Sequence, residues 1–194
     1  MEVLILLGSP RPSGNSATLA RRFGETAEKM GATVKAYHLN KLSYRGCQAC
    51  MTCKGKLDHC VLKDDLTEVL DAVRTADILV MATPVYYGEV SSQMKGFIDR
   101  TFSYLAPDYR TNPAPSRLPA GKKLVFIQTQ AQPDEKLFND IFPRYRMFFS
   151  WYGFNDIHLI RGCGVIDKDD AQSRPELMQL AEETTMRLLS SRKL

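Results

Sequence analysis

Four cysteines lie close together in the sequence, with a spacing suited to metal or thiol chemistry. Two residues separate Cys47 from Cys50 and Cys50 from Cys53, and six more residues precede Cys60. A Cys-x-x-Cys-x-x-Cys turn brings three thiolates near one point, and a cubane iron–sulfur cluster needs four. Because the chain contains no second set of this kind, Cys60 would have to supply the fourth ligand.

Three interpretations of these cysteines stay open. The first is a [4Fe–4S] cluster, whose negative charge would be offset by the neighbouring basic residues Arg45, Lys54, Lys56 and Lys63. The second is a structural zinc ion, which four thiolates also bind. The third is no metal, with the cysteines as redox-active thiols. A disulfide framework is not expected, because the cysteine count of 5 is odd and no export signal is apparent.

A segment rich in glycine and hydroxyl side chains follows the first apolar run. Residues 8–18 read GSPRPSGNSAT and lie between an expected strand and an amphipathic helix. There the free backbone N–H groups of the helix and its dipole favour a bound phosphate. Glycine lets the backbone approach an oxygen closely, and hydroxyls donate hydrogen bonds. A simple helix cap needs only one such residue, so the segment predicts a phosphate site.

Other phosphate motifs do not fit this segment. The spacing of Gly8 and Gly14 excludes G-x-G-x-x-G, and Asn15 stands where a P-loop needs lysine. The segment has no cysteine for a phosphatase-type loop, and the first and third apolar runs lack the aspartates of a response regulator. A monophosphate held without chemistry remains, which suits the tail of flavin mononucleotide (FMN).

Short apolar runs alternate with amphipathic segments, at residues 3–7, 34–39, 78–81, 124–127 and 157–160. This alternation predicts a parallel sheet with helices on both faces. The first, third and fourth runs are apolar at successive positions, as in strands covered on both faces. The second and fifth carry polar residues and are expected at the edges. The prediction is an α/β protein with a flavodoxin-like, doubly wound, five-stranded parallel sheet of order 2-1-3-4-5.

Apolar stripes at helical spacing predict helices after Asn15, after Asp64–Asp65, around 94–105 and from Pro175. On the third of these helices we expect the adjacent Asp99 and Arg100 to form an ion pair. Two segments, 46–60 and 107–121, are long for connections between strands and helices and are therefore candidates for function. We expect residues 1–194 to form one domain.

The third strand ends in residues 83–88, TPVYYG. In the predicted order, the first and third strands flank the point beyond whose carboxyl ends ligands bind. Residues 83–88 and 8–18 should therefore face one crevice. Backbone groups of residues 85–88 can hydrogen-bond the polar edge of an isoalloxazine ring, and Tyr86 or Tyr87 can flank it. The end of the fourth strand, residues 128–131, would form a third wall.

Taken together and in order, these motifs resemble the NAD(P)H-dependent FMN reductase family over roughly residues 1–165. The first motif is Gly8-Ser9-Pro10-Arg11 with Gly14-Asn15-Ser16, and the second is 83–88 followed by 94–100. The cysteine motif with Lys63-Asp64-Asp65 resembles the iron–sulfur flavoprotein branch of that family.

The resemblance implies FMN as cofactor and NAD(P)H as electron donor. It places the FMN phosphate at Ser9, Arg11, Asn15, Ser16 and Thr18. It places the ring at Pro84, Val85, Tyr86, Tyr87 and Gly88, with Thr129 and Gln130 on the third wall. It also implies a homodimer or homotetramer with the flavin near a subunit contact. Ala131 stands where relatives often have glycine.

The predicted chemistry belongs to the flavin, and no side chain is assigned a catalytic role of its own. One candidate function is NAD(P)H-dependent reduction of flavin, quinone or another small-molecule acceptor. The other is an iron–sulfur flavoprotein electron carrier that accepts electrons from a ferredoxin-like partner. A net charge of +4 is too mild to indicate nucleic acid and differs from the acidic surface of a flavodoxin-type carrier. No apolar run is long enough to span a membrane, and we expect a cytoplasmic protein.

Overall fold

The computed structural model describes residues 1–190; the last residues of the predicted domain, 191–194, lie outside the described residues. Its centre is a sheet whose parallel strands follow the order β2-β1-β3-β5-β6. These strands are β1 (Glu2–Leu7), β2 (Thr33–His38), β3 (Ile78–Tyr86), β5 (Lys123–Thr129) and β6 (Asp156–Gly162). The predicted order 2-1-3-4-5 and the flavodoxin-like fold class are confirmed.

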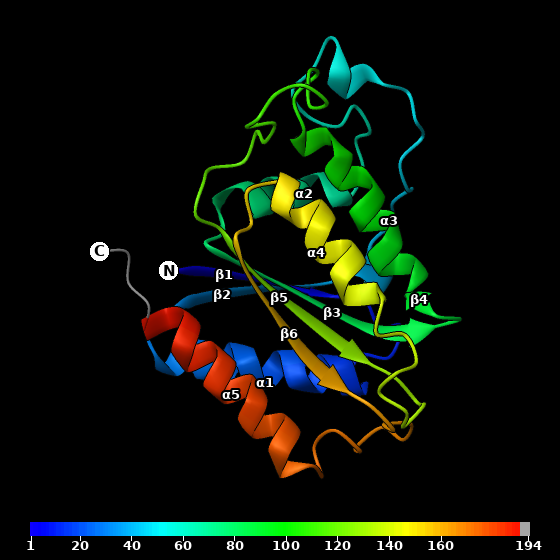
Figure 1. The fold of residues 1–194 in the computed structure, drawn as a ribbon, viewed down its shortest axis with the longest axis vertical. Helices are drawn as coiled ribbons and strands as arrows, with labels where there is room; N and C mark the ends of the chain where they lie inside the picture. The colour runs from blue at the N-terminus through cyan, green and yellow to red at the C-terminus, as the bar shows by residue number, and fades with distance from the viewer. Residues whose placement is uncertain (191–194) are drawn as a thin grey trace.

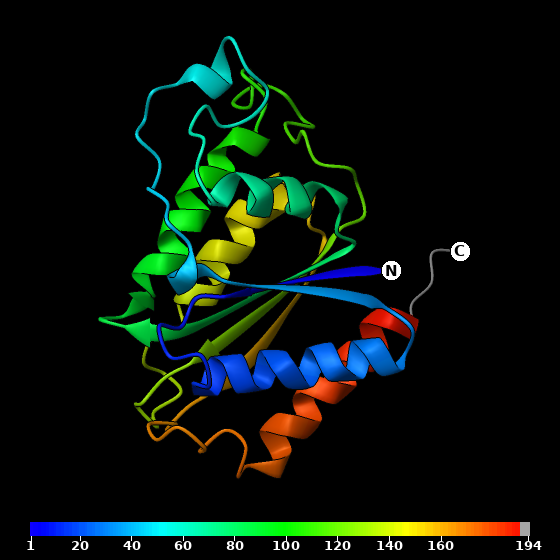
Figure 2. The same ribbon diagram turned by 180° about the vertical axis from the view of Figure 1, so that it is seen from behind.

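Helices cover both faces of this sheet (Figures 1 and 2). On one face lie α1 (Asn15–Lys29) and α5 (Pro175–Ser190), and on the other lie α2 (Leu66–Thr75), α3 (Ser92–Arg100) and α4 (Ile141–Trp151). Strand β1 shows why both layers form. Its residues Val3, Ile5 and Leu7 pack in the core under α1 and α5, while Leu4 and Leu6 pack in the core under α2, α3 and α4. Alternate residues of a strand point to opposite faces, so an unbroken apolar run supplies two cores.

The third strand is longer than the apolar run 78–81 indicated. Residues 78–84 pair with β5 along their whole length, and the strand continues to Tyr86. Its last residues then turn back into the short strand β4 (Glu89–Val90), which pairs antiparallel with Val85 and Tyr86. This hairpin was not predicted, because a two-residue strand leaves no periodic signal. It carries most of the segment expected to hold a flavin ring.

The two long irregular segments lie together at one end of the molecule, beyond the end of α3 (Figures 1 and 2). They contact one another: an Nη of Arg117 donates to the Cys53 carbonyl at 2.8 Å. The short 3-10 helix η2 (Thr52–Lys54) lies within the first segment, and η3 (Thr101–Tyr104) directly follows α3. A further one, η1 (Leu39–Lys41), follows β2 and lies beside the start of α3, where the Gln93 amide donates to Asn40. Within residues 1–190, no helix combines the length and the apolar character that crossing a membrane requires.

Candidate functional site

The loop after β1 is joined to the start of α3. The Gly8 N–H donates to the Ala82 carbonyl at 2.8 Å, which continues the pairing of β1 with β3. The Ser91 hydroxyl donates to the Gly8 carbonyl at 2.7 Å and accepts from the Met94 N–H at 3.2 Å, so that it also caps α3. The predicted phosphate segment and the segment after β3 therefore meet at the carboxyl edge of the sheet.

Gly8 is required by how closely these segments approach. A Cβ atom at Gly8 would lie 2.9 Å from the Met94 Cβ, closer than real Cβ atoms come to their neighbours, and 3.0 Å from the Ser91 Oγ. A side chain here would push the loop away from α3. The first glycine of the predicted motif thus sets the distance between the two segments.

The N-terminus of α1 offers unshared donors and buried hydroxyls. The N–H groups of a first helical turn have no acceptor within their own helix, and within residues 1–190 α1 has no side-chain cap, because its N-cap residue is Gly14. The side chains of Ser9 and Ser16 are buried, at 5% and 1% exposure. The first turn holds no acidic residue. Donors and dipole therefore converge where an anion is favoured.

Asn15 has a structural role that its sequence position did not reveal. Its Nδ2 donates to the Asp167 carbonyl and its Oδ1 accepts from the Ala171 N–H, each at 2.9 Å. Both ends of the amide therefore fasten the segment after β6 to the start of α1. The backbone N–H of Asn15 and the second hydrogen of its Nδ2 remain as donors for a phosphate.

The β3–β4 hairpin presents the predicted ring-binding residues. Tyr87 and Gly88 have φ values of 50° and 75°, which is the pattern of a type I′ turn at a hairpin tip. The side chain of Tyr86 is 43% exposed and that of Tyr87 is fully exposed. A Cβ atom at Gly88 would lie 3.4 Å from the Phe138 ring. The segment after β5 therefore packs against the hairpin tip.

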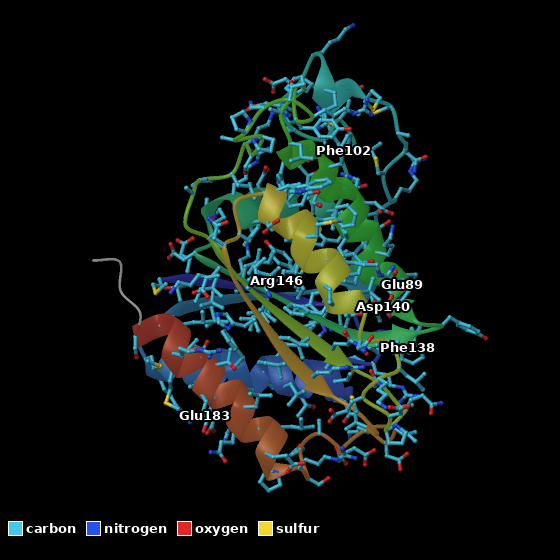
Figure 3. All side chains as sticks on the ribbon, viewed as in Figure 1. Glu89, Phe102, Phe138, Asp140, Arg146 and Glu183 are labelled. Atoms are coloured by element: carbon cyan, nitrogen blue, oxygen red, sulfur yellow. The ribbon has the colours of Figure 1, made fainter. Side chains whose placement is uncertain are left out.

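Glu89 fastens this hairpin to α4 (Figure 3). Its carboxylate accepts from the Tyr145 hydroxyl at 2.9 Å and from Arg144 at 3.1 Å. Figure 3 shows Glu89, Phe138 and Asp140 close together beside β4 and the beginning of α4. The hairpin is thus held by α4 through Glu89 and by the segment after β5 through Phe138.

The end of β5 supplies a buried polar row: Gln128, Thr129 and Gln130. The Gln130 Nε2 donates to the carbonyls of Gln132 and Asp134 at 3.0 and 3.2 Å, and its Oε1 accepts from Arg161 at 2.7 Å. Gln130 therefore holds the segment after β5 in place. The Gln128 Oε1 is buried without a hydrogen-bond partner among the described residues.

The four cysteines of the motif line one cavity of about 130 Å³, together with Arg100 and Phe102. The backbone turns tightly between them, since Ala49 and Met51 adopt left-handed conformations with φ of 52° and 58°. All four thiols are free. Across residues 1–190, no three His, Cys, Asp or Glu side chains lie in a metal-holding group. The cysteines thus share a cavity wall with their sulfur atoms apart.

Arg100 is the charged residue in the wall of this cavity. The sequence predicted instead that it pairs with its neighbour Asp99. Its guanidinium, 1% exposed, pairs with Asp64 at 2.8 Å, whereas Asp99 pairs with Lys95 at 2.5 Å. The expected Asp99–Arg100 ion pair is therefore wrong. Adjacent residues on a helix point about 100° apart, so a residue pairs more readily with one four positions away.

Two further groups give the cysteine segment a setting that favours thiolates. The Lys54 ammonium donates to the Leu105 carbonyl at 2.7 Å and lies 4.0 Å from the centre of the Phe102 ring. Burial lowers the pKa of Lys54, although the charge of the neighbouring Cys53 acts in the opposite direction. Hydrogen bonds with Thr52 lower the pKa of the Cys50 thiol. The cavity thus offers four thiols as donors and a positive charge from Arg100 in its wall. The Arg100 Nε is buried and has no partner within the described part of the chain. These features fit an anionic metal–thiolate group.

Comparison with known proteins gives a family match and a shared fold. A model of the family described as NADPH-dependent FMN reductase matches residues 1–135. An iron-sulfur flavoprotein of Archaeoglobus fulgidus is 36% identical over 104 residues, which are 54% of this chain and 47% of that protein. The matches span about half the length of such curated relatives.

Two solved structures resemble the whole chain. The FMN-dependent NADH-azoreductase of Bacillus anthracis, in complex with FMN, has a TM-score of 0.74 and 17% identity, covering 97% of this chain and 100% of that one. The NAD(P)H:quinone oxidoreductase of Methanothermobacter marburgensis has a TM-score of 0.75 and 17% identity, covering 100% and 98%. At this identity the likeness concerns the fold.

Proposed function

The chain belongs to the NADPH-dependent FMN reductase family, and on this basis we propose that it is an FMN-dependent oxidoreductase that takes a hydride from NAD(P)H. The electrons pass to flavin, quinone or another small acceptor. Bound FMN supplies the redox chemistry. The residues of the chain hold and orient the cofactor.

The observation that carries this proposal is the uncapped α1 N-terminus beside the Gly8–Ser91 hydrogen bond. In the proposed complex, the buried hydroxyls of Ser9 and Ser16 and the Asn15 N–H bind the FMN phosphate. Thr18 lies one turn further along α1, and the exposed Arg11 lies at the rim. A dianionic phosphate suits this place because the helix dipole and the free N–H groups act on it together.

We assign the ring end to the β3–β4 hairpin, at residues 84–88, as the sequence predicts. Tyr86 and Tyr87 are exposed there and can lie against a flat ring. Thr129 is buried on the neighbouring strand, in register with Pro84. Gln130 acts through the segment after β5, which it holds against the hairpin, so its proposed role is to position that wall.

A second candidate function, electron transfer through an iron–sulfur cluster, is favoured by the cavity that the four cysteines share. Cys47, Cys50, Cys53 and Cys60 would hold a [4Fe–4S] cluster, which transfers single electrons, and a ferredoxin-like protein would be the electron donor. Zinc or free thiols are the alternatives at this site.

The exposed apolar residues Met147, Phe148 and Trp151 on α4 support the proposed homodimer or homotetramer.

The two functions are separated by steady-state turnover of the FMN-loaded protein, purified and assayed without oxygen. Oxidation of NADH or NADPH with free flavin or a quinone as the only acceptor would support the reductase. Turnover that requires a reduced ferredoxin and ignores both nicotinamides would support the carrier. Protein that binds no FMN would contradict both.

A further inference from the structure

We propose that Arg100 is the positioning residue of the four-cysteine site: it holds both ends of the cysteine segment together and places a fixed positive charge in the cavity wall. This inference rests on the iron–sulfur part of the proposed function. It concerns a residue outside the cysteine motif, carried on a different element of the fold.

The contacts of Arg100 reach both flanks of the segment. One Nη donates at 2.9 Å to the carbonyl of Arg45, a residue that precedes Cys47. The other Nη donates at 3.2 Å to the carbonyl of Leu62, a residue that follows Cys60. Within the described residues, this single guanidinium therefore joins the beginning and the end of the loop that carries all four cysteines.

Asp64 completes this arrangement from the downstream side. Its carboxylate accepts from Arg100 at 2.8 Å and from the Arg45 and Leu66 N–H groups at 3.3 and 3.2 Å. Arg100 and Asp64 thus tie the cysteine segment to the start of α2. Such a network holds a loop without regular secondary structure in one conformation.

One nitrogen atom of the Arg100 guanidinium has no partner in this network. The Nε of Arg100 is buried and has no hydrogen-bond partner among residues 1–190. Arg100 lines the cavity that the four cysteines share. A buried N–H without an acceptor is unfavourable. A thiolate or sulfide in that cavity would provide the acceptor, and its negative charge would match the guanidinium.

Helix α3 connects this residue to the proposed flavin site. Ser91, the N-cap of α3, bonds to Gly8 beside the proposed phosphate site. Arg100 is the last residue of the same helix, Ser92–Arg100, about 14 Å away along its axis at 1.5 Å per residue. Arg100 therefore fixes the cysteine segment to the element that also borders the flavin site.

The test compares the full-length wild-type protein with R100Q, R100K and R22Q. Arg22 is a matched control, because its Nε is also buried without a partner while its guanidinium pairs with Glu182 between α1 and α5. Each protein is loaded with FMN and reconstituted anaerobically with ferrous iron and sulfide. Iron and sulfide per chain, the midpoint potential of the cluster and FMN affinity are then measured.

We expect R100Q to hold at least fivefold less iron than the wild type, with a more negative midpoint potential for the fraction that remains. R100K keeps the charge but cannot reach both flanks, so it should lose at least twofold in iron while its potential stays close to wild type. R22Q should match the wild type. FMN affinity should be unchanged in all variants. A purely structural role would not separate the potential of R100K from that of R100Q.

Equal iron content and equal potential in R100Q and wild type would overturn the inference, and so would an equal loss in R22Q. If R100Q does not fold, R100K decides alone: less iron at an unchanged potential supports the inference, and wild-type iron overturns it. Wild-type protein that binds FMN but no iron would overturn the inference together with the cluster, while the flavin function would stand. Iron bound without FMN, and lost in R100Q, would support the inference and contradict the flavin function.

Discussion

The Ser91 hydroxyl donates to the Gly8 carbonyl at 2.7 Å across 83 positions of sequence. This one bond joins the loop after β1 to the cap of α3, and so it joins the two segments proposed to hold opposite ends of FMN. Ser91 is fully buried. The distance between these segments is therefore set by packed groups, and substitutions there should affect cofactor binding strongly.

Gly8→Ala should weaken FMN binding about tenfold or more and destabilise the fold by about 1–3 kcal/mol, because the added methyl group overpacks a filled space. A Cβ at this position would lie 2.9 Å from the Met94 Cβ. Isothermal titration with FMN and urea unfolding measure the two effects. Gly55→Ala is the control, since a Cβ there meets nothing within 4 Å. An unchanged affinity in Gly8→Ala would contradict the proposed site.

Ser16→Ala should weaken FMN binding by about tenfold, because a hydrogen bond to a charged group is worth about 1.5–3 kcal/mol. The Ser16 side chain is buried in the first turn of α1. Thermal unfolding of the protein without FMN should change little. Ser92→Ala removes an exposed hydroxyl from the start of another helix and should leave the affinity as it is. Equal affinities in the two variants would argue against a phosphate at α1.

Asp64→Asn should remove part of the acid sensitivity of the fold. Burial opposes ionisation of Asp64, but hydrogen bonds and charge from Arg100 and nearby N–H groups prevail and lower its pKa in the folded protein. A carboxylate with a lowered pKa stabilises the fold above its unfolded pKa of about 3.9, and this stability is lost as the pH falls through the folded pKa.

Urea unfolding between pH 7 and pH 3 measures this effect. We expect Asp64→Asn to lose about 1–3 kcal/mol of unfolding free energy at pH 7 and to show a flatter decline below pH 4 than the wild type. Asp99→Asn breaks an exposed ion pair with Lys95 and should change stability by only about 0.5 kcal/mol. Identical pH profiles for the two variants would show that the Asp64–Arg100 pair contributes no more to the acid sensitivity of the fold than the exposed pair does.

Gln130→Ala should loosen the segment after β5. The Gln130 amide bonds to the carbonyls of Gln132 and Asp134 and to Arg161, and these groups would lose their partner. We expect faster amide hydrogen exchange over residues 132–138 and several-fold weaker FMN binding. Gln132→Ala, at an exposed position, should leave the exchange rates unchanged. If the amides of residues 132–138 exchange as slowly in Gln130→Ala as in the wild type, then contacts other than those of Gln130 hold this segment.

The sheet could be predicted because its signal is local and repeated. Runs such as Val3–Leu7 are apolar at every position since both of their faces are buried, and polar residues in 34–39 and 157–160 marked the edge strands, which are β2 and β6. The hairpin β3–β4 could not be predicted in the same way. It depends on a left-handed Tyr87, a conformation that favours glycine and gives no pattern of its own.

The roles of single polar residues were the harder part. Asn15 and Gln130 were assigned to the cofactor by their places in motifs, yet their amides hold loops that lie far away in sequence or fold back onto the strand. Arg100 was paired with its neighbour Asp99, although its partner Asp64 is 36 positions away. Such contacts arise only when the fold brings distant elements together, and the spacing of residues along the chain does not encode them.

The most direct test of the account compares how tightly the purified, flavin-free protein binds FMN and riboflavin, which differ only in the phosphate. We expect one FMN per chain, bound at least about tenfold more tightly than riboflavin, because hydrogen bonds to a charged group are worth about 1.5–3 kcal/mol each and at least one is lost with the phosphate. Fluorescence titration measures both affinities. Equal affinities for the two flavins would contradict a phosphate site at the start of α1, and so would the absence of binding.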